Sequence, residues 1–161
     1  PEVSNEHLLA SMDNWLGPYL EPINLLSHFK KLDLKLILTA LLTWEQNQQL
    51  NALAPQRLQV PSGSSYALDY TTSPPVLAVK LQEMFGCVDT PALLNGQVTL
   101  TVHLLSPAGR PVQVTQNLAG FWNTSYQDVR KEMKGRYPKH SWPQDPHNAV
   151  PTGKAKPRRK N

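Results

Sequence analysis

The sequence contains a single cysteine, Cys87, among its 161 residues. One thiol excludes a disulfide within the chain and a metal site built on several thiolates. A lone cysteine also fits a reducing compartment, so we expect a cytoplasmic protein. No apolar run reaches the roughly 18 residues of a membrane-spanning helix, and we expect no signal peptide and no membrane partner. Because the sequence starts at Pro1 without a methionine, we interpret it as a fragment of a longer protein or a processed chain.

The motifs of nucleotide-dependent and metal-dependent catalysis are also missing from the sequence. There is no G-x-G-x-x-G, no H-E-x-x-H and no G-x-x-x-x-G-K-[ST], since Gly153-Lys154 lacks the preceding glycine and strand. The five histidines have no metal-ligand spacing to one another or to Cys87. His103 and Asp69 are interpreted as solvated side chains and Cys87 as a packing residue. We therefore predict no catalytic residue, no metal site and no cofactor for this chain.

Positive charge is scarce until the C-terminal quarter of the sequence. Residues 1–123 contain 6 Lys/Arg and 9 Asp/Glu, a net charge of −3. Residues 124–161 contain 10 Lys/Arg and 3 Asp/Glu, a net charge of +7. A mildly acidic body with a strongly basic end is typical of a chain that meets a polyanion. The alternative is that the basic end only aids solubility.

Hydrophobic periodicity predicts an α+β fold. The pattern predicts a helix that begins at Ser4 and ends before Gly17, and a longer helix from Leu34 to Leu53 capped by Asp33. Alternating residues predict a hairpin over 57–70 and strands over 97–105 and 112–115, and the run 76–86 is interpreted as a helix between them. Together these elements predict a small, mostly antiparallel sheet or partly open barrel with an interposed helix.

These elements suggest four parts of the chain. We predict a helical segment at 1–54, a small α+β sheet domain at 55–123, a basic helix and proline-rich strap at 124–147, and a disordered basic tail at 148–161. The tail is too polar, and too rich in proline and charge, to fold alone. Its basic residues, Lys154, Lys156, Arg158, Arg159 and Lys160, would add non-specific attraction to a polyanion.

The segment "SYQDVRKEMKG" at 125–135 predicts a helix with a sorted surface. Ser125 and Asp128 resemble a capping box, and Gly135 is a natural stop. At about 100° per residue, Tyr126, Val129 and Met133 share an apolar face. Arg130, Lys131 and Lys134 line one flank of that face, and Asp128 and Glu132 line the other. We expect the helix to dock by its apolar face and to offer a basic edge.

The strap "RYPKHSWPQDP" at 136–146 follows this helix and must be extended, because residues before proline avoid helical geometry. In nucleic-acid-binding proteins, aromatic rings stack on bases while Lys and Arg contact phosphates. This pattern makes candidate nucleic-acid contacts of Arg130, Lys131, Lys134, Arg136, Tyr137, Lys139, His140 and Trp142, with Arg110 in the "SPAGRP" loop as a further candidate. The alternative for Tyr137 and Trp142 is that they pin the strap onto the domain.

Two long motifs carry a resemblance to a known family. "LLSPAGRPVQVTQNLAGFW" at 104–122 and "SYQDVRKEMKGRYPKHSWPQDP" at 125–146 resemble the C-terminal region of bacterial HrpB-type helicases, which are relatives of the DEAH-box ATP-dependent helicases. The resemblance extends more loosely through 60–70 and 74–86 to "NWLGPYL". One departure is Asn117, where an aspartate is expected, and either residue caps a helix.

The resemblance implies a parent protein that hydrolyses ATP with Mg²⁺ and acts on RNA or possibly DNA through two RecA-like domains. Those domains and their ATP motifs are absent from this sequence, so no catalytic residue carries over. Two hypotheses follow for this chain. The first is a non-catalytic accessory domain that contacts RNA or another nucleic acid through the basic helix and strap. The second is a protein-interaction or intramolecular docking module, in which the strap braces the helicase core of the same chain or recruits a partner.

Overall fold

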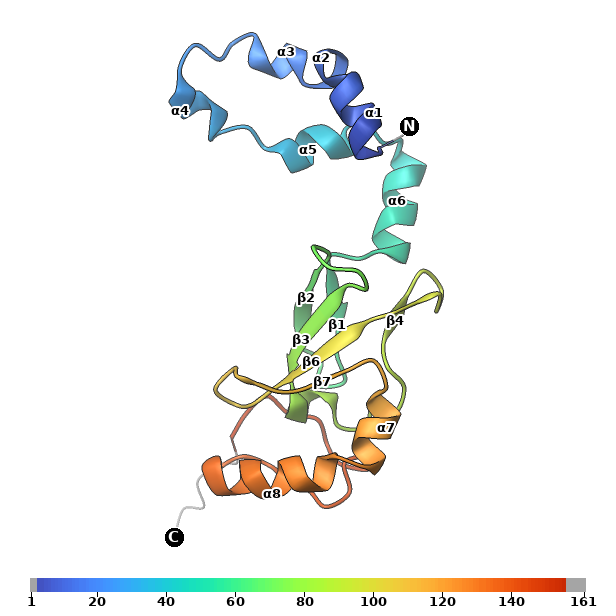
Figure 1. Ribbon diagram of the computed structural model, residues 1–161, viewed down its shortest axis with the longest axis vertical. Helices are drawn as coiled ribbons and strands as arrows, with labels where there is room; N and C mark the ends of the chain where they lie inside the picture. Colours follow the sequence, from blue (N-terminus) through green and yellow to red (C-terminus); the bar gives the residue numbers. More distant parts are fainter. Residues whose placement is uncertain (1–2, 156–161) are drawn as a thin grey trace. The chain divides into compact units, whose positions relative to one another are not determined.

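The computed structural model describes residues 3–155, and these form two compact units that divide between Ala52 and Leu53 (Figure 1). The first unit is helical, and the second contains the sheets and the C-terminal helices. No helix in the described range 3–155 is long and apolar enough to cross a membrane.

Six short helices make up the first unit. They are α1 (Asn5–Ala10), α2 (Met12–Trp15), α3 (Gly17–Leu20), α4 (Leu26–Phe29), α5 (Leu34–Thr39) and α6 (Trp44–Leu53). Ser4 caps α1 as predicted, since its hydroxyl accepts a hydrogen bond from the His7 amide. The single helix predicted up to residue 16 is divided at Ser11, and Gly17 and Pro18 begin α3 where the sequence predicted a stop.

The long helix predicted from Leu34 to Leu53 is wrong, because the chain breaks between α5 and α6. Thr43 and Gln46 form a capping box at the break. The Gln46 side chain accepts from the Thr43 amide at 2.9 Å, and the Thr43 hydroxyl accepts from the Gln46 amide at 3.2 Å. In the first half of the predicted helix only Ile37 is buried, while Leu34 and Leu36 are exposed.

The second unit contains a five-stranded sheet in the order β1-β2-β3-β6-β7 and a two-stranded sheet, β4-β5. The strands are β1 (Arg57–Gln59), β2 (Ser65–Asp69), β3 (Val76–Lys80), β4 (Ala92–Leu93), β5 (Val98–Thr99), β6 (Thr101–Leu105) and β7 (Pro111–Thr115). The predicted 57–70 hairpin is confirmed as β1 and β2. The sheet is mostly antiparallel, as expected, but β3 and β6 pair in parallel.

The interposed helix predicted over 76–86 is wrong. Residues Val76–Lys80 form strand β3 and Leu81–Met84 form a short 3-10 helix, η1. A short apolar run does not show by its periodicity whether it is a buried strand or a buried helix. The segment is a strand because it lies between β2 and β6, and both neighbours complete its backbone hydrogen bonds.

The core of the second unit lies between the sheet and the two C-terminal helices, α7 (Leu118–Asn123) and α8 (Tyr126–Arg136). Asn117 caps α7 with its side-chain oxygen, 2.8 Å from the Gly120 amide nitrogen. Four aromatic rings then pack edge to face or tilted, with centroids 4.9–6.2 Å apart. They belong to Phe85, Phe121, Trp122 and Tyr126. Helix α8 therefore lies across one end of the sheet with its apolar face inward (Figure 1).

The two ends of α8 differ from the sequence prediction. Ser125 makes no capping bond with its side chain, because its backbone already has helical geometry as the chain leaves α7. Gly135 does not stop the helix, which continues through Arg136. Arg136 therefore lies on the helix, on the same flank as Glu132, and not on an extended strap.

Residues 148–155 lie on the sheet unit, although the sequence predicted disorder from 148 onward. The Thr152 amide donates to the Gln82 carbonyl at 3.0 Å, and Ala149 packs against the core. Gly153 lies so close to Glu83 that a Cβ would be 2.6 Å from the Glu83 carboxylate oxygen. Backbone pairing and a glycine at the point of closest approach order this polar stretch. The predicted tail residues Lys156, Arg158, Arg159 and Lys160 lie outside the described residues.

Candidate nucleic-acid interface

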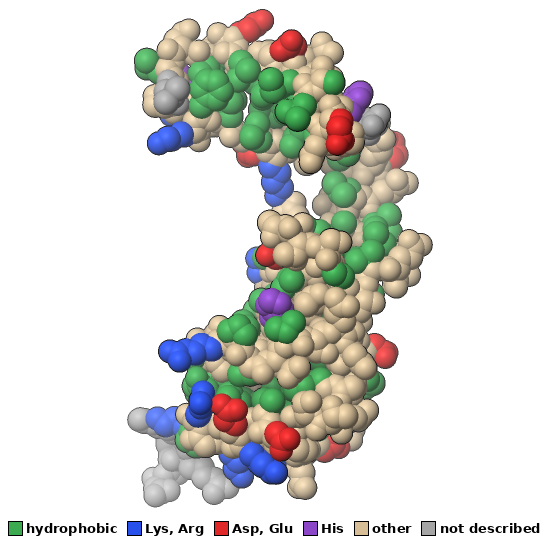
Figure 2. All heavy atoms as spheres, viewed as in Figure 1, with side chains coloured by type: hydrophobic (Ala, Val, Ile, Leu, Met, Phe, Trp, Pro, Cys, Tyr) green, Lys and Arg blue, Asp and Glu red, His purple; other side chains and the backbone are tan. Residues whose placement is uncertain are grey.

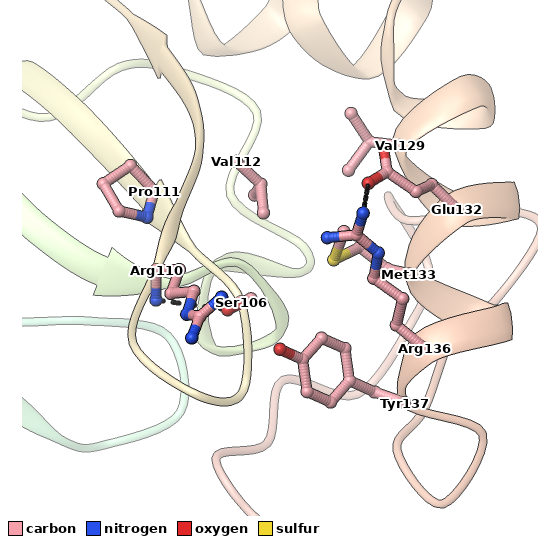
Figure 3. A pocket seen from close by; sticks show the side chains of 9 residues that line it. All are labelled: Ser106, Arg110, Pro111, Val112, Val129, Glu132, Met133, Arg136 and Tyr137. Atoms are coloured by element: carbon pink, nitrogen blue, oxygen red, sulfur yellow. Dashed lines mark hydrogen bonds and ion pairs between the residues drawn. The ribbon is translucent and has the colours of Figure 1, made fainter.

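A pocket of about 240 Å³ lies between α8 and the turn that joins β6 to β7 (Figure 3). It brings together three candidates from two distant segments: Arg110 from the turn, and Arg136 and Tyr137 from the end of α8. Gly109, with φ +79°, allows the turn to reverse. Ser106 closes the turn, because its hydroxyl accepts from the Arg110 amide at 3.1 Å and its amide donates to the Arg110 carbonyl at 2.8 Å.

The pocket has a charged rim and an apolar wall. Figure 3 shows the Arg136 side chain folded back along α8 toward Glu132, and the Tyr137 ring pointing at the 106–111 turn. Arg136 Nη2 lies 3.2 Å from Glu132 Oε1, with both side chains more than half exposed. The wall consists of Pro111, Val112, Val129 and Met133. Two guanidinium groups and one carboxylate leave this rim net positive.

A second pocket, of about 270 Å³, shares Arg136 and Tyr137 with the first. Its other lining residues are Pro138, Lys139, His140 and Ala155. The Tyr137 and His140 rings are perpendicular, with centroids 6.3 Å apart. Burial, followed by the positive charge of Lys80, lowers the pKa of His140. Five of the nine candidate residues, Arg110, Arg136, Tyr137, Lys139 and His140, therefore line two pockets that share a wall.

Arg130, Lys131 and Lys134 lie on the other flank of α8 and line neither of these pockets. Arg130 is half-buried, and its Nε donates to the Trp142 carbonyl at 2.9 Å. Lys131 lies 3.7 Å from Asp128, and Lys134 is exposed. The structure therefore splits the predicted basic set between two surfaces. Figure 2 shows Lys and Arg side chains interspersed with Asp and Glu around the α8 end of the sheet unit.

Trp142 belongs to the core of the sheet unit. Its side chain is 6% exposed, and its indole N–H donates to the Tyr137 carbonyl at 2.9 Å. The strap is further held by Gln82, whose side chain donates to the Ser141 carbonyl, and by Tyr126, whose hydroxyl donates to the Pro143 carbonyl. This geometry favours packing over base stacking for Trp142. Tyr137 differs, because its ring is half-buried and lines both pockets.

Sequence reasoning missed the residues that shape the first pocket. The sequence assigned Ser106, Val112 and Met133 to a turn, a strand and an apolar helix face. It assigned Glu132 to the helix flank opposite the basic residues. Their convergence depends on the β6–β7 register and on the docking of α8, which a pattern in one segment does not reveal. The available signal was the "SPAGRP" turn, which places an arginine beside a tight reversal.

A buried carboxylate, which lies close to Gly153, was also missed. Glu83 is 3% exposed and accepts hydrogen bonds from the Ser62 hydroxyl at 2.6 Å and the Tyr66 hydroxyl at 2.5 Å. Burial alone would raise the pKa of Glu83, but hydroxyl hydrogen bonds and the charge of Lys80 outweigh it, so the pKa is lowered. Burial, together with the bond to Glu83, raises the pKa of Tyr66 to about 12. Across residues 3–155, no group of three or more His, Cys, Asp and Glu side chains is placed to hold a metal ion.

The chain is similar to known proteins over nearly its whole length. A family model described as "ATP-dependent helicase C-terminal" matches residues 15–146. The ATP-dependent RNA helicase HrpB of Escherichia coli (strain K12) is 46% identical over 157 residues. That match covers 97% of this chain but 19% of the relative, so the chain spans less than a quarter of the relative's length.

Two solved structures have the same fold as this chain. The crystal structure of E. coli DExH-box NTPase HrpB superposes with a TM-score of 0.83 at 45% identity, covering 94% of this chain and 19% of that one. The crystal structure of Escherichia coli DEAH/RHA helicase HrpB gives a TM-score of 0.68 at 43% identity, covering 88% and 18%. At these identities, the likeness extends beyond fold to family.

Proposed function

Because the chain belongs to the family of ATP-dependent helicase C-terminal domains, we propose that it is a non-catalytic accessory domain that contacts nucleic acid for such a helicase. In this proposal, ATP and Mg²⁺ bind in the helicase core of the parent protein, and this chain binds neither. The relative is named an RNA helicase, so RNA is the first nucleic acid to test. The parent protein would act in the cytoplasm.

The observation that supports the proposal is the convergence of cationic and aromatic side chains from separate segments. Arg110 and Arg136 line one pocket, and Lys139 and His140 line the next, with the Tyr137 ring between them. Guanidinium and ammonium groups bind phosphates, and an aromatic ring between two such sites offers a face to a base. Arg130, Lys131 and Lys134 remain candidates for a second phosphate-contacting surface on the opposite flank of α8.

A paired neutralisation tests which surface carries the contact. We expect Arg110→Gln with Arg136→Gln to weaken binding of single-stranded RNA roughly tenfold at low salt, equivalent to about 1.4 kcal/mol. The physical reason is the loss of two phosphate contacts. Each lost contact should also reduce the slope of log K against log salt by about 0.7. Fluorescence anisotropy across a salt series measures both quantities.

The matched control removes the same number of positive charges from the other flank of α8. Lys131→Gln with Lys134→Gln should have a smaller effect on both affinity and salt slope, because these residues line neither pocket. A larger effect of this pair would place the interface on the opposite flank. Absence of RNA binding by the wild-type chain at low salt would refute nucleic-acid contact altogether.

A second candidate function is docking on the helicase core, which the surface of the helical unit supports. Leu9, Leu36 and Trp44 are 71%, 67% and 72% exposed. An apolar groove of about 450 Å³ lies on this unit, lined by Val3, Leu8, Lys35, Leu38, Thr39, Leu42 and Leu50. Hydrophobic side chains also gather on the face of this unit that Figure 2 shows. Exposed apolar surface of this kind marks interaction sites.

Serine substitutions at the exposed apolar positions test docking. We expect Leu36→Ser with Trp44→Ser to abolish co-elution of this chain with the isolated helicase core of E. coli HrpB, because the pair removes apolar area that docking would bury. Size-exclusion chromatography of mixtures gives the readout. Val114→Ser, at an exposed position of β7, is the control and should leave co-elution unchanged. If the wild-type chain and the core elute separately, docking is refuted.

A further inference from the structure

The pocket between α8 and the 106–111 turn has an apolar wall, which binding of phosphate alone does not require. We infer that it receives one unpaired base of a single-stranded nucleic acid, with the flanking phosphates on Arg110 and Arg136. This inference rests on the proposed nucleic-acid contact and adds the class of nucleic acid and the part of it that is recognised. A duplex, whose bases are stacked inside, would contact only the rim.

The residues that line the pocket divide by polarity. Arg110 and Arg136 supply cations, while Val112, Val129 and Met133 supply an apolar wall. A phosphate alone gains nothing from the three apolar side chains, and an apolar ligand gains nothing from the two guanidinium groups. A nucleotide unit satisfies both, because it joins a flat, weakly hydrated base to an anion.

The pocket is also small. At about 240 Å³ the pocket is below the roughly 300–1,000 Å³ of sites for drug-sized ligands. It therefore suits one base and not a base pair. Bases of single strands can be splayed out and inserted singly, as sequence-reading RNA-binding domains show. The Tyr137 ring, which points across the mouth toward the turn, offers an aromatic surface to the inserted base (Figure 3).

The rim of the pocket carries an exposed ion pair. Arg136 and Glu132 are paired at 3.2 Å, with side chains 66% and 55% exposed. Exposed ion pairs of this kind contribute little free energy. A phosphate can therefore replace the Glu132 carboxylate as the partner of the Arg136 guanidinium group. Glu132 then competes with the phosphate for the same guanidinium group. Removing the Glu132 charge should therefore strengthen binding, a sign opposite to that of the arginine substitutions.

The experiment compares three ligands with the whole chain: a short single-stranded RNA, the same strand with base-free riboses, and the matching duplex. We expect the base-free strand to bind roughly tenfold more weakly than the intact strand, which matches the binding free energy that stacking of one base contributes. The duplex should bind like the base-free strand, because both offer phosphates alone.

Two variants complete the design. Val112→Phe fills the pocket without changing charge, and should weaken binding of the intact strand to the level of the base-free strand while leaving the latter unchanged. Glu132→Gln should strengthen binding of the intact strand severalfold. Unfolding midpoints of both variants are measured in parallel. If Val112→Phe does not fold, the intact versus base-free comparison on the wild-type chain decides.

The outcomes separate this inference from the function on which it rests. Equal affinity for intact and base-free strands overturns base insertion and leaves phosphate contact standing. An unchanged or weaker affinity of Glu132→Gln overturns the competition at the rim. Loss of binding to all three ligands overturns the proposed function itself.

Discussion

Replacing Trp142 with alanine is expected to lower the free energy of unfolding of the sheet unit by about 3–5 kcal/mol, the usual cost of deleting a large buried aromatic side chain. The indole is 6% exposed and packs in the core. Its loss removes the N–H donor to the Tyr137 carbonyl and leaves a cavity beneath the strap. Urea denaturation followed by near-ultraviolet circular dichroism of the aromatic cluster measures the change.

Trp44 provides a matched control for this substitution. It is 72% exposed at the start of α6, so Trp44→Ala should change stability by less than about 0.5 kcal/mol. Trp142→Phe should lower the free energy of unfolding by an amount between those of Trp44→Ala and Trp142→Ala, because it keeps a ring but loses the indole hydrogen bond. A Trp142→Ala chain with wild-type stability and lost RNA affinity would show that the ring stacks on bases, contrary to its burial in the structure.

This result would assign separate roles to two aromatic residues of the strap. Trp142 would hold the strap to the sheet unit, and Tyr137 would present its ring at the wall between the pockets. Arg130 would join Trp142 in the structural role, because its Nε donates to the Trp142 carbonyl. Part of the predicted contact set would then act on nucleic acid only through the position of the strap.

Glu83→Gln is expected to destabilise the sheet unit by about 2 kcal/mol at neutral pH, in the range of a hydrogen bond to a charged group. The carboxylate accepts from Ser62 and Tyr66, and the charge of Lys80 also favours its ionised form. A neutral amide accepts these bonds more weakly. It also places an N–H₂ group opposite one of the two hydroxyl donors.

The same substitution should change how stability depends on pH. The pKa of Glu83 is lowered on folding, because hydrogen bonds and Lys80 outweigh the opposing effect of burial. Its contribution is therefore complete above the unfolded pKa of about 4.5 and is lost as the pH falls through the lower folded value. Wild-type stability should decline in this acidic range, and Glu83→Gln should decline less steeply.

Urea midpoints between pH 7 and pH 3 measure that slope, and Asp128→Asn is the control. Asp128 lies on the exposed surface of α8, 3.7 Å from Lys131, and removing so weak a surface pair should leave the midpoint at neutral pH nearly unchanged. Identical slopes for wild type and Glu83→Gln would mean that Glu83 does not contribute to the acid sensitivity of the sheet unit.

Local patterns predicted the elements whose partners are close in sequence. The 57–70 hairpin, the alternation along β6 and the Asn117 cap of α7 all depend on short-range rules, and the structure confirms them. Strand β3 was mistaken for a helix because its neighbours β2 and β6 decide its geometry, and β6 is distant in sequence. The break before α6 carried a local signal, Thr43 with Gln46, which sequence reasoning missed.

In the candidate site, too, local geometry was predictable from the sequence, and contacts between distant segments were not. The helical wheel correctly grouped Arg130, Lys131 and Lys134 on one flank, since helix geometry alone fixes that relation. The meeting of Arg110 with Arg136 depends on the β6–β7 register and on α8 docking, so the sequence offered Arg110 only as an isolated candidate. Glu132 entered the site because α8 continues through Arg136, past Gly135.

The hydrogen bond from the Trp142 indole to the Tyr137 carbonyl bears on how the proposed interface would bind nucleic acid. It fixes the backbone of the one residue whose ring separates the two pockets, so their spacing is set before anything binds. A strand that occupies both pockets must then adopt that spacing itself, and the entropy lost on binding falls on the nucleic acid more than on the protein. The domain would therefore bind most tightly those nucleic-acid strands that are flexible enough to match the fixed spacing of the two pockets.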